Sequence, residues 1–264
     1  MGTLIFVGAG LGSIAYMSIA ALEQLKSCDD VFIEEYTGFF EHGFAERLKD
    51  ILGRQVLTLS RKEVEEGKRV LEAAEKGTVA LLCAGDTMAA TTHVSLRLQA
   101  AVSGIDTKVI YAPSILTAAP SALGLQHYKF GRTTTVPRFF PGYRPVSPAE
   151  IIAANFSSGL HTLVLLDTHN GWQPLSPQEA LAELLEMSAS SGLTVPGSET
   201  FVCILSRIGM SEQSIKSGKI GAMLNEDYGH PPHCIVVPAK LHFQEAEALC
   251  AFAGASKELM KEIM

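Results

Sequence analysis

The amino-acid sequence predicts an α/β fold whose first part is built around a mainly parallel sheet. From residue 4 to residue 111, short β-type runs alternate with stretches of helical periodicity. Strands that are joined through helices pair in parallel and bury both sheet faces under helices. The chain has 264 residues, 47% of them hydrophobic and 19% charged. It can therefore form one large or two small domains, and it is not a disordered chain.

Each element of the first part has its own local signal. β-type runs predict strands at residues 4–7, 31–33, 55–59, 78–84 and 107–111, and apolar periodicity predicts helices at 13–25, 43–52, 60–76 and 91–102. Ser60 and Glu63 form a capping-box pattern that opens the third of these helices. Gly53 and Gly77 follow helices, where glycine is typical of a C-terminal stop.

The second part repeats the alternation less regularly. We expect strands at residues 160–166, 200–205 and 234–237, and helices at 147–156, 176–188 and 241–253. Pro148 and Pro177 suit the first turn of their helices. The segment 136–148, rich in proline, arginine and aromatic residues, is predicted to be a loop.

Charge and hydropathy narrow the functional classes. The 21 Lys and Arg against 28 Asp and Glu give a net charge of −7, which argues against nucleic-acid binding by bulk electrostatics. Residues 3–22 are free of charged side chains and could be taken for a membrane span or a signal peptide. No Lys or Arg precedes them, however, and three glycines interrupt them. We therefore expect strand, turn and helix in a soluble protein.

The cysteines indicate a reducing environment. There are five, widely spaced and without a C-x-x-C pattern, so we expect neither a disulfide framework nor a cysteine-based zinc site. Cys83 and Cys203 lie within apolar runs, and we interpret them as small core residues. The cytoplasm is the expected location.

A glycine loop after the first predicted strand is the first candidate ligand site. In Phe6-Val7-Gly8-Ala9-Gly10-Leu11-Gly12-Ser13, the glycines would let a ligand approach the backbone at a helix N-terminus. A dinucleotide site would have glycine in place of Ser13 and an acid about 20 residues later. Glu34 and Glu35 end the second strand. A nicotinamide-binding loop and a tight turn without a ligand both remain open.

The second candidate site follows the buried strand 78–84. Asp86 lies beyond the carboxyl end of that strand, where open parallel sheets bind ligands. Its carboxylate could accept hydrogen bonds from a ribose or an amino group, and Gly85 would leave space for a bulky ligand. Alternatively, Asp86 merely caps the helix 91–102.

The remaining segments are less informative alone. Residues 112–119 combine a strand end with a helix start and could form a ligand rim, whereas residues 124–131 are predicted to be a loop. His230 and His233 beside Cys234 suggest a metal, but no second ligand cluster has a recognisable spacing, so we expect none. A Gly-x-Ser-x-Gly elbow and a phosphate-binding Gly-x-x-x-x-Gly-Lys-Ser/Thr loop are absent from the sequence.

These segments belong to an ordered set of short motifs. The set consists of Val7-Gly8-Ala9-Gly10-Leu11, Ala84-Gly85-Asp86, Ala90-Thr91-Thr92-His93, Ala112-Pro113-Ser114-Ile115, Gly124-Leu125, Tyr128-Lys129-Phe130-Gly131, Gly159-Leu160-His161-Thr162-Leu163, Leu166-Asp167, Pro231-Pro232-His233, Val237-Pro238, Lys240-Leu241-His242 and Glu245-Ala246-Glu247. It spans nearly the whole chain and resembles the diphthine synthases, S-adenosylmethionine-dependent methyltransferases of the tetrapyrrole-methylase-like class. The sequence departs from the family at Thr87, where relatives usually have proline. Threonine can hold the same turn less rigidly.

The resemblance implies two α/β domains, residues 1–113 and 114–264, with the cofactor in a cleft between them. The implied cofactor is S-adenosylmethionine, its product is S-adenosylhomocysteine, and no metal is needed. Family cofactor contacts, carried over by position, fall on Leu11, Asp86, Ala89, Ser114, Ile115, Leu166, Ile208 and His233. The resemblance also implies a homodimer whose protein substrate is translation elongation factor 2.

The implied reaction belongs to diphthamide biosynthesis. It methylates the amino group, and in some relatives also the carboxylate, of a 3-amino-3-carboxypropyl chain on a histidine. Water, His93 and the substrate itself are candidate bases, although we interpret His93 as a residue that faces solvent or makes a structural hydrogen bond. Two rival hypotheses remain, an NAD-dependent dehydrogenase and a non-enzymatic module that binds the elongation factor.

A segment of cations and aromatic residues is a candidate recognition surface. Residues 129–144 contain no Asp or Glu, and they carry Lys129, Arg132, Arg138, Arg144, Phe130, Phe139, Phe140 and Tyr143. Arginine and aromatic side chains are enriched at binding hot spots, so the segment could receive a carboxylate or an acidic face of the elongation factor. A solvated loop and part of a dimer interface are the alternatives.

Overall fold

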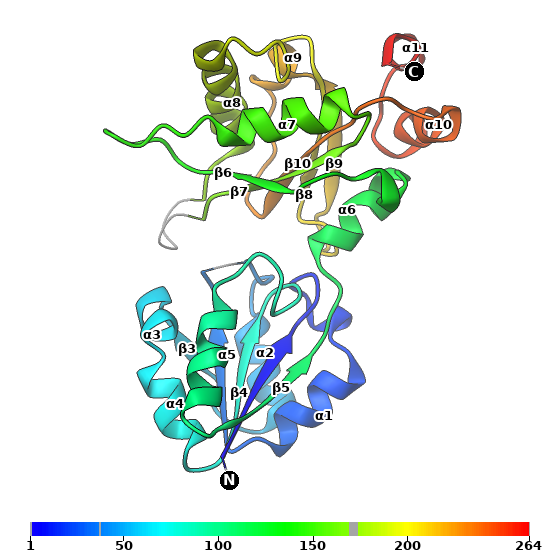
Figure 1. Ribbon diagram of the computed structural model, residues 1–264. Coiled ribbons are helices and arrows are strands. Elements are labelled where there is room, and N and C mark those ends of the chain that lie inside the picture. Colours follow the sequence, from blue (N-terminus) through cyan, green and yellow to red (C-terminus); the bar gives the residue numbers. More distant parts are fainter. Residues whose placement is uncertain (1, 37, 169–173, 264) are drawn as a thin grey trace. The chain divides into compact units, whose positions relative to one another are not determined.

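The computed structural model describes residues 2–36, 38–168 and 174–263. They divide into two compact units, unit 1 up to Ile115 and unit 2 from Leu116 onward (Figure 1). Each unit is built around a five-stranded sheet with helices packed on it, which confirms the predicted α/β class. The predicted domain boundary after residue 113 stays a prediction.

Unit 1 contains the elements expected from the alternating pattern. Its strands are β1 (Thr3–Gly8), β2 (Asp30–Glu34), β3 (Leu57–Leu59), β4 (Thr78–Cys83) and β5 (Asp106–Ile110). Its helices are the 3-10 turn η1 (Ile14–Tyr16), α1 (Ile19–Ser27), α2 (Phe44–Leu52), α3 (Arg61–Glu66), α4 (Lys68–Ala74) and α5 (His93–Val102).

The sheet of unit 1 is parallel and covered on both faces, as predicted. Its order is β3-β2-β4-β1-β5. Side chains alternate between the faces of a strand. Leu4 and Phe6 of β1 thus join a core with α3, α4 and α5, whereas Ile5 and Val7 join a second core with α1 and α2 (Figure 1).

Two predicted helices of unit 1 were wrong in extent. The helix expected at 13–25 begins only at Ile19, because Met17 is extended and the Ser18 side chain caps α1 by accepting the Ala21 N–H. The helix expected at 60–76 is two helices, α3 and α4. Gly67 separates them with a φ of 70°, a left-handed conformation that ends a helix.

Unit 2 has a mixed sheet of order β6-β7-β10-β8-β9, in which β6 and β7 are parallel and the other pairs antiparallel. The strands are β6 (Thr134–Val136), β7 (Thr162–Leu166), β8 (Phe201–Ser206), β9 (Ser214–Lys219) and β10 (His233–Val237). The helices are α6 (Ile115–Leu123, which starts at the unit boundary), η2 (His127–Lys129), α7 (Ser147–Ser157), α8 (Pro177–Ser191), α9 (Ile220–Met223), α10 (Phe243–Phe252) and α11 (Lys257–Ile263).

The core of unit 2 lies between one sheet face and helices α7, α8 and α9 (Figure 1). Every strand and helix predicted for this part exists, within a few residues at each end. The helix start predicted within residues 112–119 is that of α6, whereas β6, β9, η2, α9 and α11 were not predicted. The β9 sequence Ser-Ile-Lys-Ser-Gly-Lys is mostly polar and carries no strong β signal, so its pairing with β8 depends on tertiary context.

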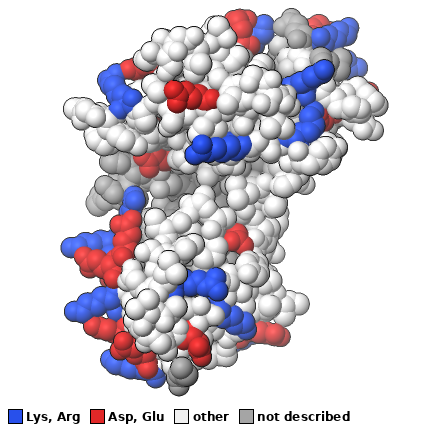
Figure 2. All heavy atoms as spheres, viewed as in Figure 1, with Lys and Arg blue, Asp and Glu red and all other residues white. Residues whose placement is uncertain are grey.

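Charged side chains of both signs are intermingled on α3 and α4. Four ion pairs, among them Arg61–Glu65 and Arg69–Glu63, lie along α3 and α4. Figure 2 shows this region as intermingled blue and red spheres at the lower left. In the described part of the chain, no helix is both long and apolar enough to cross a membrane. The five cysteines are unpaired, and Cys83 and Cys203 are core residues, as predicted.

Candidate functional site

The carboxyl ends of β1, β4 and β5 meet in unit 1. Gly10 and Gly85 form an isolated bridge, in which the Gly85 N–H donates to the Gly10 carbonyl at 2.6 Å. A Cβ on Gly8 would lie 2.7 Å from both the Ala112 Cβ and the Gly85 carbonyl oxygen, so only glycine fits there. The glycines therefore allow three strand ends to approach closely, and Leu11 follows directly.

The glycine loop lacks the geometry of a dinucleotide site. The chain passes through η1 before α1 begins at Ile19, so the loop does not lead directly into the N-terminus of an α-helix. Dinucleotide folds use that N-terminus to bind pyrophosphate. Glu34 is fully buried, and its Oε2 accepts the Tyr36 N–H at 3.1 Å. Glu34 is therefore not placed to hold a ribose, and the dehydrogenase hypothesis is not favoured.

Asp86 closes the turn after β4. Its Oδ1 accepts the Met88 N–H at 2.9 Å, and its Oδ2 accepts the Ala112 N–H at 3.4 Å, which ties the end of β4 to the end of β5. The N-cap of α5 is Thr92, so the helix-cap interpretation of Asp86 was wrong. Each carboxylate oxygen has a further lone pair that can accept from a ribose hydroxyl or an amino group. Asp86 could therefore still accept hydrogen bonds from a ligand at this edge.

Residues with positive φ lie at the same edge of the sheet of unit 1. Ala90, next to Ala89, has a φ of 55°, which is unusual for a residue with a side chain and costs on the order of 1 kcal/mol. Gly85 has a φ of 75°, and a Cβ there would lie 3.6 Å from the Cβ of buried Ser114. Ile115 follows Ser114. The five expected contacts of unit 1 thus border the same three strand ends.

The other three expected contacts lie at one edge of the sheet of unit 2. Strand β10 runs antiparallel to β7 and β8, and its first residue, His233, pairs with Ser206. The ends of β7 and β8 are therefore beside the start of β10. Leu166 ends β7, and Ile208 lies two residues beyond Ser206.

Arg207 is a buried cation at this edge that sequence reasoning missed. Its Nε donates to the Glu212 carbonyl at 3.0 Å, and its guanidinium also donates to the Tyr228 carbonyl at 2.9 Å. Its φ is 53°. These bonds join the loop that carries Ile208 to the loop that precedes His233. A single arginine in a loop gives no sequence signal for such a role.

The ring of His233 is held in one tautomer. Its Nε2 lies 3.2 Å from the Tyr228 carbonyl, which can only accept, so Nε2 carries the proton. Burial lowers the pKa of His233, and the charge of Arg207 lowers it further. The ring is therefore neutral at neutral pH. His230 pairs instead with Glu212 at 2.8 Å.

No group of three or more metal-ligating side chains gathers in residues 2–36, 38–168 and 174–263. The expected absence of a metal stays a prediction.

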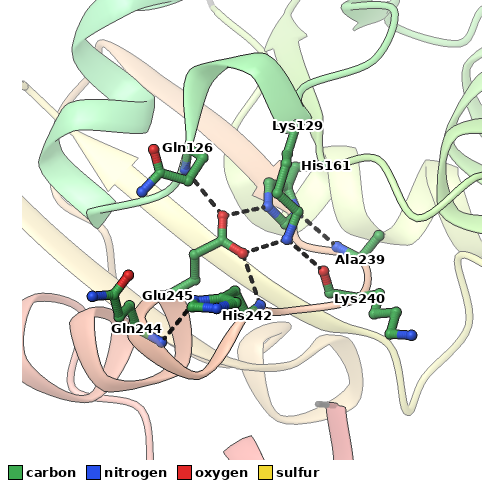
Figure 3. Close-up of polar contacts among 8 residues, drawn as sticks. All are labelled: Gln126, Lys129, His161, Ala239, Lys240, His242, Gln244 and Glu245. Atoms are coloured by element: carbon green, nitrogen blue, oxygen red, sulfur yellow. Dashed lines mark hydrogen bonds and ion pairs between the residues drawn. The ribbon is translucent and has the colours of Figure 1, made fainter.

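Several of the quoted motifs meet in a polar centre of unit 2, around Glu245 (Figure 3). Glu245 is fully buried, and its carboxylate accepts from the Gln126 N–H at 3.0 Å, His161 Nε2 at 3.1 Å, the His242 N–H at 2.9 Å and Lys129 Nζ. Burial raises the pKa of Glu245, but these donors outweigh burial and lower it to about 2. The centre joins the start of α10 to β7 and to the turn before β6.

The neighbouring His161 ring is also fixed. Its Nδ1 accepts the Ala239 N–H at 3.0 Å, so its proton is on Nε2, which donates to Glu245 (Figure 3). Burial lowers the pKa of His161, which keeps the ring neutral at neutral pH. An open pocket of about 500 Å³ beside this centre is lined by residues that include Lys240 and Gln244. The centre's own hydrogen bonds are satisfied, which indicates a structural role.

The cations of segment 129–144 are less available than the sequence suggested. Arg138 makes a bidentate pair with Glu179 at 2.7 and 3.2 Å, and Arg144 pairs with Glu186. The local absence of Asp and Glu is thus compensated by acids of α8, which lies far along the chain. That recognition surface stays a prediction, weakened by these pairs.

Comparison with known proteins identifies the relatives of this chain. Residues 3–224 match the family model described as Tetrapyrrole (Corrin/Porphyrin) Methylases. The chain is 38% identical to the diphthine synthase of Methanothermobacter thermautotrophicus over 99% of each chain. It is 37% identical to that of Methanocaldococcus jannaschii over 93% of this chain and 97% of the relative.

Solved structures give the same result. A crystal structure of diphthine synthase superimposes with a TM-score of 0.88 and 34% identity, covering 99% of this chain and all of that one. Sequence, family model and fold therefore agree over nearly the full length. The chain belongs to the diphthine synthase family, S-adenosylmethionine-dependent methyltransferases that act in diphthamide biosynthesis.

Proposed function

We propose that this chain transfers methyl groups from S-adenosylmethionine to the 3-amino-3-carboxypropyl-histidine of translation elongation factor 2. The observation that carries the proposal is the similarity to diphthine synthases over 99% of both chains. The expected contact positions also group at two sheet edges, one in each unit. A residue with a positive φ lies at each edge, Ala90 in unit 1 and Arg207 in unit 2.

We propose that the eight residues carried over from the family contact S-adenosylmethionine, and that residues 1–113 and 114–264 are two domains. S-adenosylmethionine supplies a methyl group on a sulfonium, which is already activated for transfer. Asp86 and His233 offer polar groups, and Ser114 a hydroxyl. Apolar contacts and exclusion of water come from Leu11, Ala89, Ile115, Leu166 and Ile208.

The main task of these residues is alignment. Holding a deprotonated amine in line with the methyl carbon can lower the barrier by several kcal/mol. His93 is a poor candidate base, because its ring is fully buried and its Nδ1 is bonded to the Thr87 carbonyl at 2.8 Å. The solvent-facing interpretation of His93 was therefore wrong, and the structural hydrogen bond is present. Water and the substrate itself remain as candidate bases.

The finer biological setting follows from the same proposal. Elongation factor 2 is the protein partner, the enzyme is a cytoplasmic homodimer, and neither nucleic acid, membrane nor metal takes part. Support comes from family membership, the net charge of −7 and the five unpaired cysteines.

A thermal-shift experiment tests the cofactor assignment. S-adenosylhomocysteine at about 100 times its Kd should stabilise the protein by about 2.7 kcal/mol, or roughly 5–10 °C, because it binds only the folded state. NAD at the same concentration should produce no shift. A shift with NAD alone would favour the dehydrogenase, and no shift with either would favour a binding module.

A further inference from the structure

The turn that carries Asp86 and Ala89 needs external support. The Ala89 N–H donates to the Asp86 carbonyl at 3.1 Å, which makes Thr87 and Met88 the central residues of a β-turn. Proline is favoured at the first central position, because its ring fixes φ. Thr87 occupies that position and lacks this restraint. It is fully buried, so solvent does not satisfy its carbonyl.

His93, the first residue of α5, provides that support. Its Nδ1 lies 2.8 Å from the Thr87 carbonyl oxygen and 3.5 Å from the Thr87 Oγ1. A carbonyl oxygen can only accept, so Nδ1 must carry a proton. The imidazole thus connects the start of a helix to the middle of the turn.

Glu34, at the end of β2, faces the other ring nitrogen. Its Oε1 lies 3.9 Å from His93 Nε2, and both side chains are fully buried. Among the described residues, Nε2 has no hydrogen-bond partner. The hydrogen bond to Thr87 fixes the orientation of the ring, and the Nε2 edge of the ring then lies toward the Glu34 carboxylate.

We propose that Glu34 and His93 form a buried positioning pair that fixes the Asp86–Ala89 turn for cofactor binding. Glu34 orients the ring of His93, and the Nδ1–H of His93 holds the Thr87 carbonyl in place. Asp86 and Ala89 are thereby held in place without either member of the pair touching the cofactor. This inference rests on the proposed function, because it assigns the pair a role at the S-adenosylmethionine site.

Two substitutions of His93 separate the clamp from the packing. In His93→Asn, the side-chain amide can still donate near the Nδ1 position, so the S-adenosylhomocysteine Kd should stay within about threefold of wild type. In His93→Gln, a polar side chain still extends toward Glu34, but the hydrogen bond to the Thr87 carbonyl is lost. Its Kd should rise about tenfold, or about 1.4 kcal/mol. KM for S-adenosylmethionine should rise equally, with kcat changed less than twofold.

Leu96→Ala is the matched control, since Leu96 is a buried residue of the same helix whose side chain lies beside Gly67, between α3 and α4. It should lower the melting temperature yet leave the Kd unchanged. Equal weakening of binding in His93→Asn and His93→Gln, or the same weakening in Leu96→Ala, would overturn the proposal and leave only a stability role.

A measurement on the unsubstituted protein covers the case in which variants do not fold. Nitrogen-15 NMR of histidine-labelled protein should show His93 Nδ1 protonated, and the signal should persist when S-adenosylhomocysteine binds. A ring with a bare Nδ1 would refute the clamp. If the wild-type protein fails to bind S-adenosylhomocysteine at all, the proposed function fails, and this result is distinct from either outcome above.

Discussion

Replacement of Asp86 by alanine should damage both folding and cofactor binding, by separable amounts. Its carboxylate makes one good hydrogen bond to the Met88 N–H at 2.9 Å and one long bond to the Ala112 N–H at 3.4 Å. A hydrogen bond to a charged group contributes about 1.5–3 kcal/mol, but the long bond is weak and water reaches the half-buried site. We expect Asp86→Ala to lose about 1–2 kcal/mol of unfolding free energy, or roughly 2–8 °C.

Asp86→Ala should also weaken cofactor binding, separately from its effect on stability. If Asp86 anchors the cofactor, its loss should weaken S-adenosylhomocysteine binding by about 1–3 kcal/mol, which is about 5- to 150-fold in Kd. Calorimetric titration measures the Kd, and scanning calorimetry without ligand measures the stability. Asp86→Asn keeps an acceptor for the Met88 N–H and is the control, with stability within about 0.5 kcal/mol of wild type. A destabilised Asp86→Ala with an unchanged Kd would refute the anchoring role.

Three further predictions concern unit 2. Glu245→Gln should lose about 3 kcal/mol at pH 7. Because the folded pKa of Glu245 is about 2, below its usual 4.5, its stabilisation is complete above pH ~4.5 and is lost as the pH falls toward 2. The wild-type and variant unfolding curves should therefore converge in acid, and a constant gap would contradict this. Arg207→Met should raise the Kd of S-adenosylhomocysteine more than threefold in calorimetric titration, because it removes the bonds between the loop that carries Ile208 and the loop that precedes His233. An unchanged Kd would contradict this. Charge reversal of Arg138 should cost less than about 1 kcal/mol, since its pair with Glu179 is partly exposed, and should leave cofactor binding intact.

The sequence predicted the order of the elements well, because the signals are local. Period-two and helical patterns located the strands and helices of unit 1, and Ser60 with Glu63 forms the capping box expected of it. The predicted helix boundaries were wrong where the conformation of a single residue ends the helix. Gly67 splits a helix through a left-handed backbone, and sequence periodicity does not distinguish that glycine from one tolerated inside a helix.

The candidate site was predicted less completely. Asp86 could be singled out because it follows a buried strand directly. Arg207 and the Glu34–His93 pair could not, because their partners lie up to 59 residues away in the chain and meet only through the fold. Glu34 was even considered for a ribose, since a carboxylate at a strand end looks the same in sequence whether it is buried or exposed.

Segment 129–144 shows that charge pairing over long sequence distances is equally hard to predict. Its cations looked unopposed because no acid lies nearby in the sequence, yet Glu179 and Glu186 of α8 face Arg138 and Arg144. Local charge counts therefore overstated how many cations are free to meet a partner.

Methyl transfer to the protein substrate is the most direct test of the central claim. S-adenosylmethionine with a labelled methyl group would be incubated with the enzyme and with elongation factor 2 that carries the unmethylated 3-amino-3-carboxypropyl-histidine. Factor with an unmodified histidine serves as the control. We predict that label enters only the factor that carries the side chain. A folded enzyme that binds S-adenosylhomocysteine but leaves that factor unlabelled would contradict the proposed reaction.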